Sequence, residues 1–221
     1  MKGVGIASPA TPLQPQRGGW RDSARRAALV STLLLAAVWA WSHFQQHSAA
    51  LHGSPLKPVP APSLSGFTDT QGRAFSWTRE RGRAVLVFFG YTHCPDVCPL
   101  TLAALAQSLE RLGPLRKQVR VVFVTLDPAR DTAPVLRAYL DAFLPDTIGL
   151  RAAMPAVRVS ARQWGITWRR VDTADGAYWI DHTAAVTLVG PDGRLVARYG
   201  YGQLTDPSWL ADDLRTVLER G

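Results

Sequence analysis

The chain has 221 residues, 47% of them hydrophobic, and carries a formal net charge of +8 at pH 7. This length and composition are those of a globular protein with one sizeable hydrophobic core. The positive charge does not indicate nucleic-acid binding, because residues 1–26 alone contribute +4 and no basic stripe interleaved with aromatic side chains follows.

The first predicted element is a membrane-spanning helix. Residues 27–41 are uncharged and mostly apolar, and with three flanking residues the run reaches about eighteen, near the lower limit for crossing a bilayer. A cleaved signal peptide with residues 48–50 as its cleavage site is the alternative. The long apolar run, the distant cleavage site, and Trp39 and Trp41 at the level of an interfacial belt favour an uncleaved transmembrane signal anchor over 27–44.

The charges predict the orientation of this helix. Four arginines precede it, whereas its other side carries no Lys or Arg before Lys57, so residues 1–26 form a basic cytoplasmic N-terminus. We therefore predict a single-pass protein of the inner (cytoplasmic) membrane whose C-terminal part lies in the periplasm or another extracytoplasmic, oxidising space. Residues 45–63 are rich in Pro, Ala and Ser and predict an extended linker to a folded domain over 64–221.

From residue 66 onward, strand patterns alternate with helix patterns. The predicted order is a β-hairpin over 66–77, a buried strand over 84–89, a helix over 99–112, a strand over 119–126, a helix from Asp131 or Thr132 to 143, a short strand at 148–150, a helix over 155–164, a hairpin over 168–180, strands over 183–189 and 195–199, and a helix from 206. This order predicts an α/β architecture with a mixed central sheet flanked by helices. A strand that leads directly into a helix bearing two cysteines, with a late hairpin and a final helix, is the thioredoxin-like arrangement.

Cys94 and Cys98 are the only cysteines, and they follow the buried strand directly. On a helix, positions four apart share one face with Cα atoms about 6 Å apart, which permits a disulfide or a shared metal ion. A helix N-terminus also favours thiolates. Three residues separate the pair, whereas thioredoxin-type oxidoreductases have two. A structural disulfide is the common use of two cysteines in an exported domain, but so short a loop gives little stabilisation.

A soft monovalent ion such as Cu(I) needs two or three sulfur or nitrogen ligands, so an imidazole would complete a site built on two thiolates. The chain offers five candidates: His43, His47 and His52 in the membrane-proximal stretch, His93 beside Cys94, and His182. We expect His93 to point away from the cysteines, and we expect His182 to enter a strand that runs beside the cysteine loop. Alone, a histidine at a strand start is more commonly a surface or capping residue.

Three segments together resemble the Sco/SenC family: residues 88–99, 126–132 and 178–183. The resemblance covers about residues 60–220 and implies a membrane-anchored, thioredoxin-fold copper chaperone for cytochrome c oxidase assembly. It implies that Cys94, Cys98 and His182 are the copper ligands, for Cu(I) and with Cu(II) left open. Asp127-Pro128 and Arg130-Asp131 match a family signature near the site; we expect a turn and a helix cap at Asp131 rather than ligands.

The leading hypothesis is therefore a monomeric copper-binding assembly factor that delivers copper to the binuclear site of the copper-accepting subunit of cytochrome c oxidase. The alternative is an enzyme, a thiol–disulfide oxidoreductase whose redox-active pair, Cys94 and Cys98, reduces the cysteines of that oxidase site. Both functions need reduced thiols. A peroxidase of the thioredoxin superfamily is disfavoured, because the Thr/Cys and Arg constellation that it requires is not evident.

Overall fold

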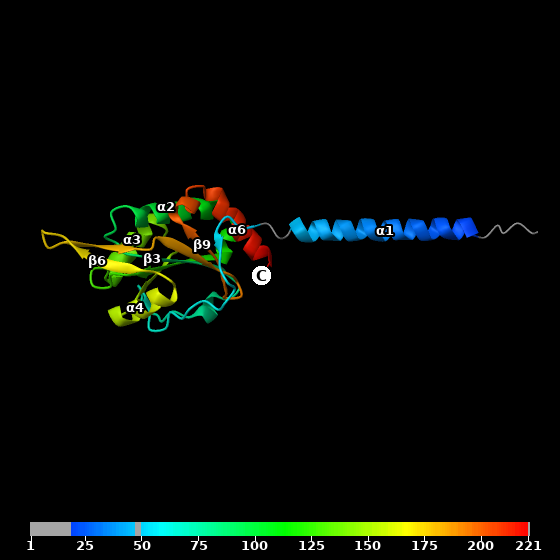
Figure 1. Ribbon diagram of the computed structural model, residues 1–221. Helices are drawn as coiled ribbons and strands as arrows, with labels where there is room; N and C mark the ends of the chain where they lie inside the picture. The colour runs from blue at the N-terminus through cyan, green and yellow to red at the C-terminus, as the bar shows by residue number, and fades with distance from the viewer. Residues whose placement is uncertain (1–18, 47–49, 221) are drawn as a thin grey trace, which may run out of the picture. The chain divides into compact units, whose positions relative to one another are not determined.

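The computed structural model describes residues 19–46 and 50–220, and the chain forms two compact units that divide after Ala50 (Figure 1). The first unit contains a single described helix, α1, Gly19–Gln46, of 28 residues. The predicted membrane segment is thus helical. Within the described residues, no helix combines the length and the apolarity required to cross a membrane. Residues 1–18 lie outside the described residues, as do residues 48 and 49 of the possible cleavage site and the side chains of 40–44. The anchor therefore stays a prediction.

The second unit is built on a seven-stranded sheet in the order β1-β9-β8-β3-β4-β5-β2. Its strands are β1 (Ser54–Pro55), β2 (Thr68–Asp69), β3 (Ala84–Gly90), β4 (Val119–Thr125), β5 (Ile148–Arg151), β8 (Ala185–Val189) and β9 (Leu195–Gly200). β3, β4 and β5 run parallel, whereas β8, β9, β1 and β2 pair antiparallel. The sheet is therefore mixed, as predicted.

Helices cover both faces of this sheet (Figure 1). They are α2 (Val97–Glu110), α3 (Ala133–Phe143), α4 (Met154–Gln163), α5 (Tyr201–Leu204) and α6 (Pro207–Arg220), with short 3-10 helices at η1 (Trp77–Glu80) and η2 (Gly113–Gln118). All seven residues of β3 are buried, because its two faces meet different helical layers. Phe88 packs beside Phe123, which contacts Tyr139 of α3, whereas Phe89 packs on Trp164 at the end of α4.

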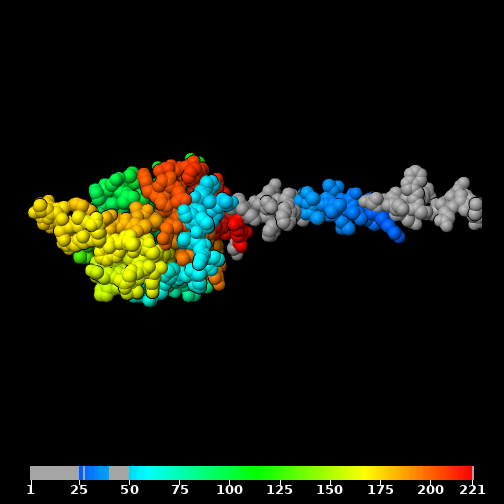
Figure 2. All heavy atoms as spheres, viewed as in Figure 1, coloured from blue at the N-terminus to red at the C-terminus, as the bar shows by residue number. Residues whose placement is uncertain are grey.

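A two-stranded ribbon stands apart from the main sheet. It consists of β6 (Trp168–Asp172) and β7 (Tyr178–His182), which pair antiparallel and project from one end of the domain (Figures 1 and 2). The ribbon confirms the hairpin predicted over 168–180. It leads directly into β8, which pairs with β3 in the main sheet. His182 therefore lies where the ribbon returns to the centre of the domain.

The predicted linker is corrected from Leu51 onward. Ser54–Pro55 forms an edge strand on β9, and the N–H of Leu56 donates to the carbonyl of Val196 at 2.9 Å. Gly53 lies so close to the ring of Tyr199 that a Cβ there would be 2.5 Å from it. Proline is tolerated in an edge strand because its missing N–H faces away from the ladder. The proline-rich composition thus indicated extended backbone correctly, but this backbone belongs to the domain.

Candidate metal centre

The three predicted site residues meet at the end of β3. Cys94 lies in the loop after β3, Cys98 lies in the first turn of α2, and His182 is the last residue of β7. Their ligand atoms all lie within 4.8 Å of one another. The Sγ atom of Cys98 is 3.5 Å from Nε2 of His182, and the N–H of Cys98 donates to Sγ of Cys94 at 3.4 Å.

Helix α2 begins at Val97, two residues earlier than predicted, and contains Cys98 but not Cys94. The expected shared helix face therefore does not bring the two cysteines together. The sulfur atom of Cys94 instead caps the helix start by accepting the N–H of Cys98. Both cysteines are free thiols, so the alternative of a structural disulfide does not describe this state.

The two thiols differ in acidity because they share a hydrogen bond. The Cys98 side chain donates to Cys94, which lowers the pKa of the Cys94 thiol; His182 and the N–H groups of Asp96 and Cys98 lower it further, against the opposing effect of burial. The same hydrogen bond raises the pKa of Cys98, and burial and the nearby charge of Cys94 add to this effect. These opposite shifts favour a thiolate at Cys94 beside a neutral thiol at Cys98.

Gly90, the last residue of β3, makes room for Cys98. A Cβ at this position would lie 3.0 Å from Sγ of Cys98 and 2.9 Å from the ring of Phe123. Cys98 is fully buried against this glycine, whereas Cys94 is 9% exposed. This need for glycine could not be predicted from the sequence, because the approach of the Cys98 sulfur atom is visible only in the folded chain.

The carboxylate of Asp131 holds the cysteine loop. It accepts hydrogen bonds from the N–H of Thr92 at 3.1 Å, from Oγ1 of Thr92 at 2.6 Å and from Oγ1 of Thr125 at 2.5 Å. Asp131 was expected to cap the following helix. That expectation is wrong, because Thr132 occupies the N-cap position of α3 and Asp131 turns back into the protein.

A second acidic residue of the same turn holds the ribbon that carries His182. The hydroxyl of Tyr178 donates to the carboxylate of Asp127 at 3.0 Å, and Nε of Arg130 contacts that carboxylate at 2.5 Å. Arg130 also donates to the carbonyl of Tyr178 at 3.0 Å and stacks 3.5 Å from the centre of its ring. The turn after β4 therefore contacts both segments that supply the candidate ligands.

The other histidines do not join the site in the part of the chain that the structure describes. His93 points away, as expected, with Nδ1 3.0 Å from Oγ1 of Thr92. His52 bonds Asp213 of α6 at 3.0 Å and stacks on Trp209. His47 and the side chain of His43 lie outside the described residues. His182 also lines a hollow of about 320 Å³ beside Trp168 and Arg169, which gives its ring a route to solvent.

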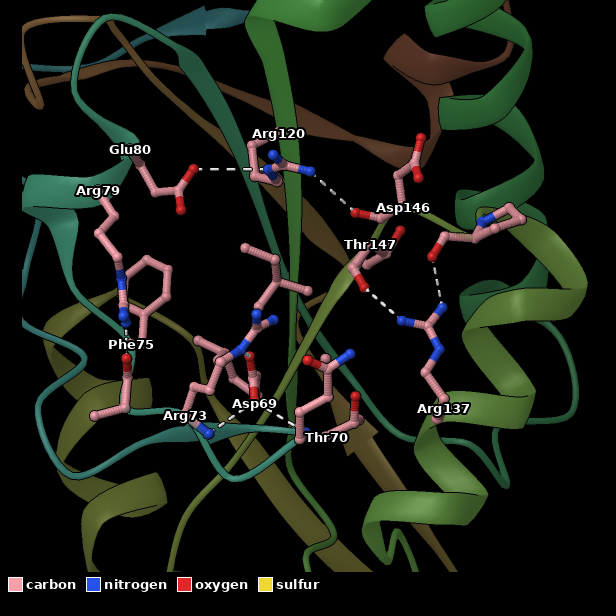
Figure 3. Close-up of a pocket in the computed structure, with 16 residues that line it drawn as sticks. Asp69, Thr70, Arg73, Phe75, Arg79, Glu80, Arg120, Arg137, Asp146 and Thr147 are labelled. Atoms are coloured by element: carbon pink, nitrogen blue, oxygen red, sulfur yellow. Dashed lines mark hydrogen bonds and ion pairs between the residues drawn. The ribbon is translucent and has the colours of Figure 1, made fainter.

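A cavity of about 410 Å³ lies elsewhere, near the start of β4 (Figure 3). Its charged side chains are largely engaged with one another or with backbone: Arg137 bonds Asp141 and the carbonyl of Thr147, and Arg120 lies 3.6 Å from Glu80. No cysteine or histidine is among the described residues that line it. This cavity therefore offers none of the soft donors found at the end of β3.

Comparison with known proteins identifies relatives of the whole domain. The chain matches the SCO1/SenC family over residues 66–219. The human mitochondrial protein SCO2 homolog is 35% identical over 150 residues, which cover 66% of this chain; the chain spans 56% of the human protein. The structure of Bradyrhizobium japonicum ScoI with copper bound is similar with a TM-score of 0.63 and 33% identity, covering 76% of this chain and 99% of that one.

The solution structure of apo Sco1 from Thermus thermophilus is similar with a TM-score of 0.67 and 35% identity. The match covers 75% of this chain and 96% of that chain. Together with the mixed sheet and its flanking helices, these likenesses confirm the predicted thioredoxin-like α/β fold.

Proposed function

This chain belongs to the SCO1/SenC family, and we propose that it is a copper-binding assembly factor for cytochrome c oxidase. It takes up Cu(I) through Cys94, Cys98 and His182 and passes the ion to the binuclear copper site of an oxidase subunit. Copper is the cargo in this function. The domain acts as a monomer.

The observation that carries this proposal is the approach of three soft or borderline donors within 4.8 Å of one another. Two free thiols and one imidazole are the ligand set that Cu(I) prefers, and a low coordination number suits an ion that must later leave. The lowered pKa of Cys94 supports uptake, because one ligand is already a thiolate near neutral pH. The imidazole Nδ1 lies 3.1 Å from the carbonyl of Thr183, which leaves Nε2 facing the sulfur atoms.

We further propose that α1 anchors the protein in the inner membrane, with the N-terminus in the cytoplasm and the copper-binding domain in the periplasm. Large apolar side chains along α1 are exposed by 56% to 70% in the isolated chain: Leu29, Val30, Leu33, Leu34, Leu35, Val38 and Trp39. Such a surface is unfavourable in water and favourable in lipid. Arg25 and Arg26 precede it, which supports this orientation.

Copper loading tests the proposal. The reduced protein, loaded with Cu(I) without oxygen and freed of excess metal, should hold about one ion per chain. Cys98→Ser should abolish this retention, because it removes a ligand atom. His52→Ala is the matched control: it removes an imidazole from the same domain whose nitrogen is bound to Asp213, and it should leave the stoichiometry unchanged. Wild-type protein that retains no copper would refute the proposal.

The second candidate function is thiol–disulfide exchange with the client. It is favoured by the pairing of a Cys94 thiolate with a buried Cys98 thiol. In this reaction the Cys94 thiolate attacks a client disulfide and Cys98 resolves the mixed disulfide. Two electrons and the one proton of the pair pass to the client as the Cys94–Cys98 disulfide forms, and water supplies the second proton of the two client thiols. Copper-independent reduction of an oxidised client with the reduced protein as sole electron donor would support this function. Copper retention without such reduction would exclude it.

A further inference from the structure

Asp131 is a fully buried carboxylate, and it is not one of the proposed copper ligands. In the described part of the domain, the basic group beside it is the half-exposed His93, whose Nδ1 lies 3.8 Å from Oδ1. A buried carboxylate with no recorded bond to an arginine or lysine side chain depends on its other hydrogen bonds for stability. Its recorded donors are Thr92, which bonds through both its N–H and its hydroxyl, and Thr125. Most of these bonds therefore go to the cysteine loop.

Asp131 itself is held rigidly. Its N–H donates to the carbonyl of Asp127 at 2.9 Å, and the guanidinium of Arg151 on β5 bonds its carbonyl. Thr125, its third partner, is the last residue of β4 and also accepts the N–H of Asp127 at 2.9 Å. The carboxylate is thus fixed to the central sheet, and Thr92, two residues before Cys94, is its partner in the cysteine loop.

Other recorded restraints on the loop that carries Cys94 are the bond from the N–H of Ile180 to the Tyr91 hydroxyl and the bond from the N–H of Cys98 to the Cys94 sulfur atom. The N–H of Cys94 donates to the carbonyl of Tyr91 at 3.3 Å, a long bond within the loop itself. Residues 91–96 belong to no strand or helix, so the position of the Cys94 sulfur atom depends in part on what holds Thr92.

We propose that Asp131 is a positioning residue for the metal centre: it clamps Thr92 and thereby places the Cys94 sulfur atom opposite Cys98 and His182. This inference rests on the proposed copper-binding function. Asp131 thus has a task in the centre, although its side chain has no recorded bond to the side chain of a proposed copper ligand.

Asparagine at this position tests the clamp with little change in shape. The carboxylate uses both oxygens as acceptors: the Thr92 hydroxyl donates to Oδ1, and the Thr92 N–H and the Thr125 hydroxyl donate to Oδ2. An amide offers only one acceptor oxygen and presents N–H groups on its other side. Asp131→Asn therefore removes the negative charge and replaces one acceptor oxygen with an NH2 group. A threonine hydroxyl that donated to that oxygen must then reverse its bond or lose it, which weakens the clamp.

Asp213→Asn is the matched control. Asp213 is an equally buried carboxylate on α6 that accepts hydrogen bonds from the hydroxyl of Tyr199 and the N–H of Gly53, neither of which belongs to the metal centre. Both variants should lose stability. Asp131→Asn alone should lower Cu(I) affinity, by about 10- to 100-fold as for other residues that orient metal ligands, and alter the copper X-ray absorption spectrum. Equal affinities in the two variants would overturn the inference.

Hydrogen exchange of the metal-free protein separates this inference from the proposed function. Amides of residues 90–98 should exchange faster in Asp131→Asn than in wild type or Asp213→Asn, whether or not copper binds. If wild type holds no copper, the proposed function fails, but the exchange rates still test whether Asp131 holds Thr92. Unchanged exchange rates in Asp131→Asn would overturn the clamp.

If Asp131→Asn does not fold, Thr92→Val replaces it, because this half-buried side chain loses only its hydroxyl. Thr92→Val should speed exchange in the same segment and weaken Cu(I) binding, and Thr92→Ser should restore both. Wild-type behaviour of Thr92→Val would contradict the clamp.

Discussion

The hydroxyl of Tyr91 accepts a hydrogen bond from the backbone N–H of Ile180 at 3.1 Å. Tyr91 follows β3 and precedes the cysteines, whereas Ile180 lies on β7, two residues before His182. The Tyr91 ring also lies edge-on to the His182 ring, with 5.9 Å between centroids. Burial raises the pKa of Tyr91, so its hydroxyl stays neutral. One side chain thus joins the two segments that bring thiols and imidazole together.

Removal of this hydroxyl should loosen the His182 segment. Tyr91→Phe leaves the N–H of the buried Ile180 without its acceptor, which costs about 1–3 kcal/mol of the free energy of unfolding, and it should weaken Cu(I) binding. Tyr199→Phe is the control, because it removes a buried hydroxyl bonded to Asp213 instead. Denaturant unfolding and Cu(I) competition titrations measure both effects. A comparable loss of copper affinity in both variants would argue against a specific link through Tyr91.

Gly90→Ala should perturb the seat of Cys98. The added methyl group would lie 3.0 Å from the Cys98 sulfur atom and 2.9 Å from the Phe123 ring, and such overpacking costs about 1–3 kcal/mol. Gly202→Ala in α5 is the control, since a Cβ there meets no atom within 4 Å. Thermal unfolding should show a lower midpoint for the first variant only. Equal midpoints would mean that the sheet adjusts to admit the methyl group.

Copper uptake should release about one proton per ion near neutral pH. The pKa of Cys94 is lowered and that of Cys98 is raised, so only Cys98 still carries a proton to be displaced when both sulfur atoms bind. As the pH falls through the lowered pKa of Cys94, that thiol also becomes protonated, so copper must displace more protons and its affinity falls more steeply. Calorimetric titrations in buffers of different ionisation enthalpy count these protons. Release of two protons at neutral pH would mean that both thiols are protonated, which would contradict the lowered pKa of Cys94.

Much of the centre could be predicted from the sequence because its ligands are chemically distinctive. Two cysteines after an apolar run indicate a thiol site at the end of a buried strand, and β3 confirms that strand. His182, 84 residues beyond Cys98, follows from the family motif and from its place beside a strand expected to run next to the cysteine loop. The ribbon that carries it was visible as two short strands around Asp175-Gly176.

The supporting residues could not be predicted, because their partners are distant in sequence. Asp131 stands where a helix cap is expected, and only the fold brings it to Thr92, 39 residues earlier. The need for glycine at position 90 depends on the approach of Cys98 from the next helix. Residues from Leu51 have a linker-like composition, and their pairing with β9 depends on an edge that forms only when the domain folds.

The central claim is that Cys94, Cys98 and His182 hold one copper ion together, and it is tested most directly by X-ray absorption and Cu(I) affinity on wild type and His182→Ala. Wild type should show two sulfur ligands and one nitrogen ligand for a single ion. His182→Ala should lose the nitrogen ligand and bind Cu(I) at least about tenfold more weakly. Unchanged ligation and affinity in His182→Ala would contradict the three-ligand centre.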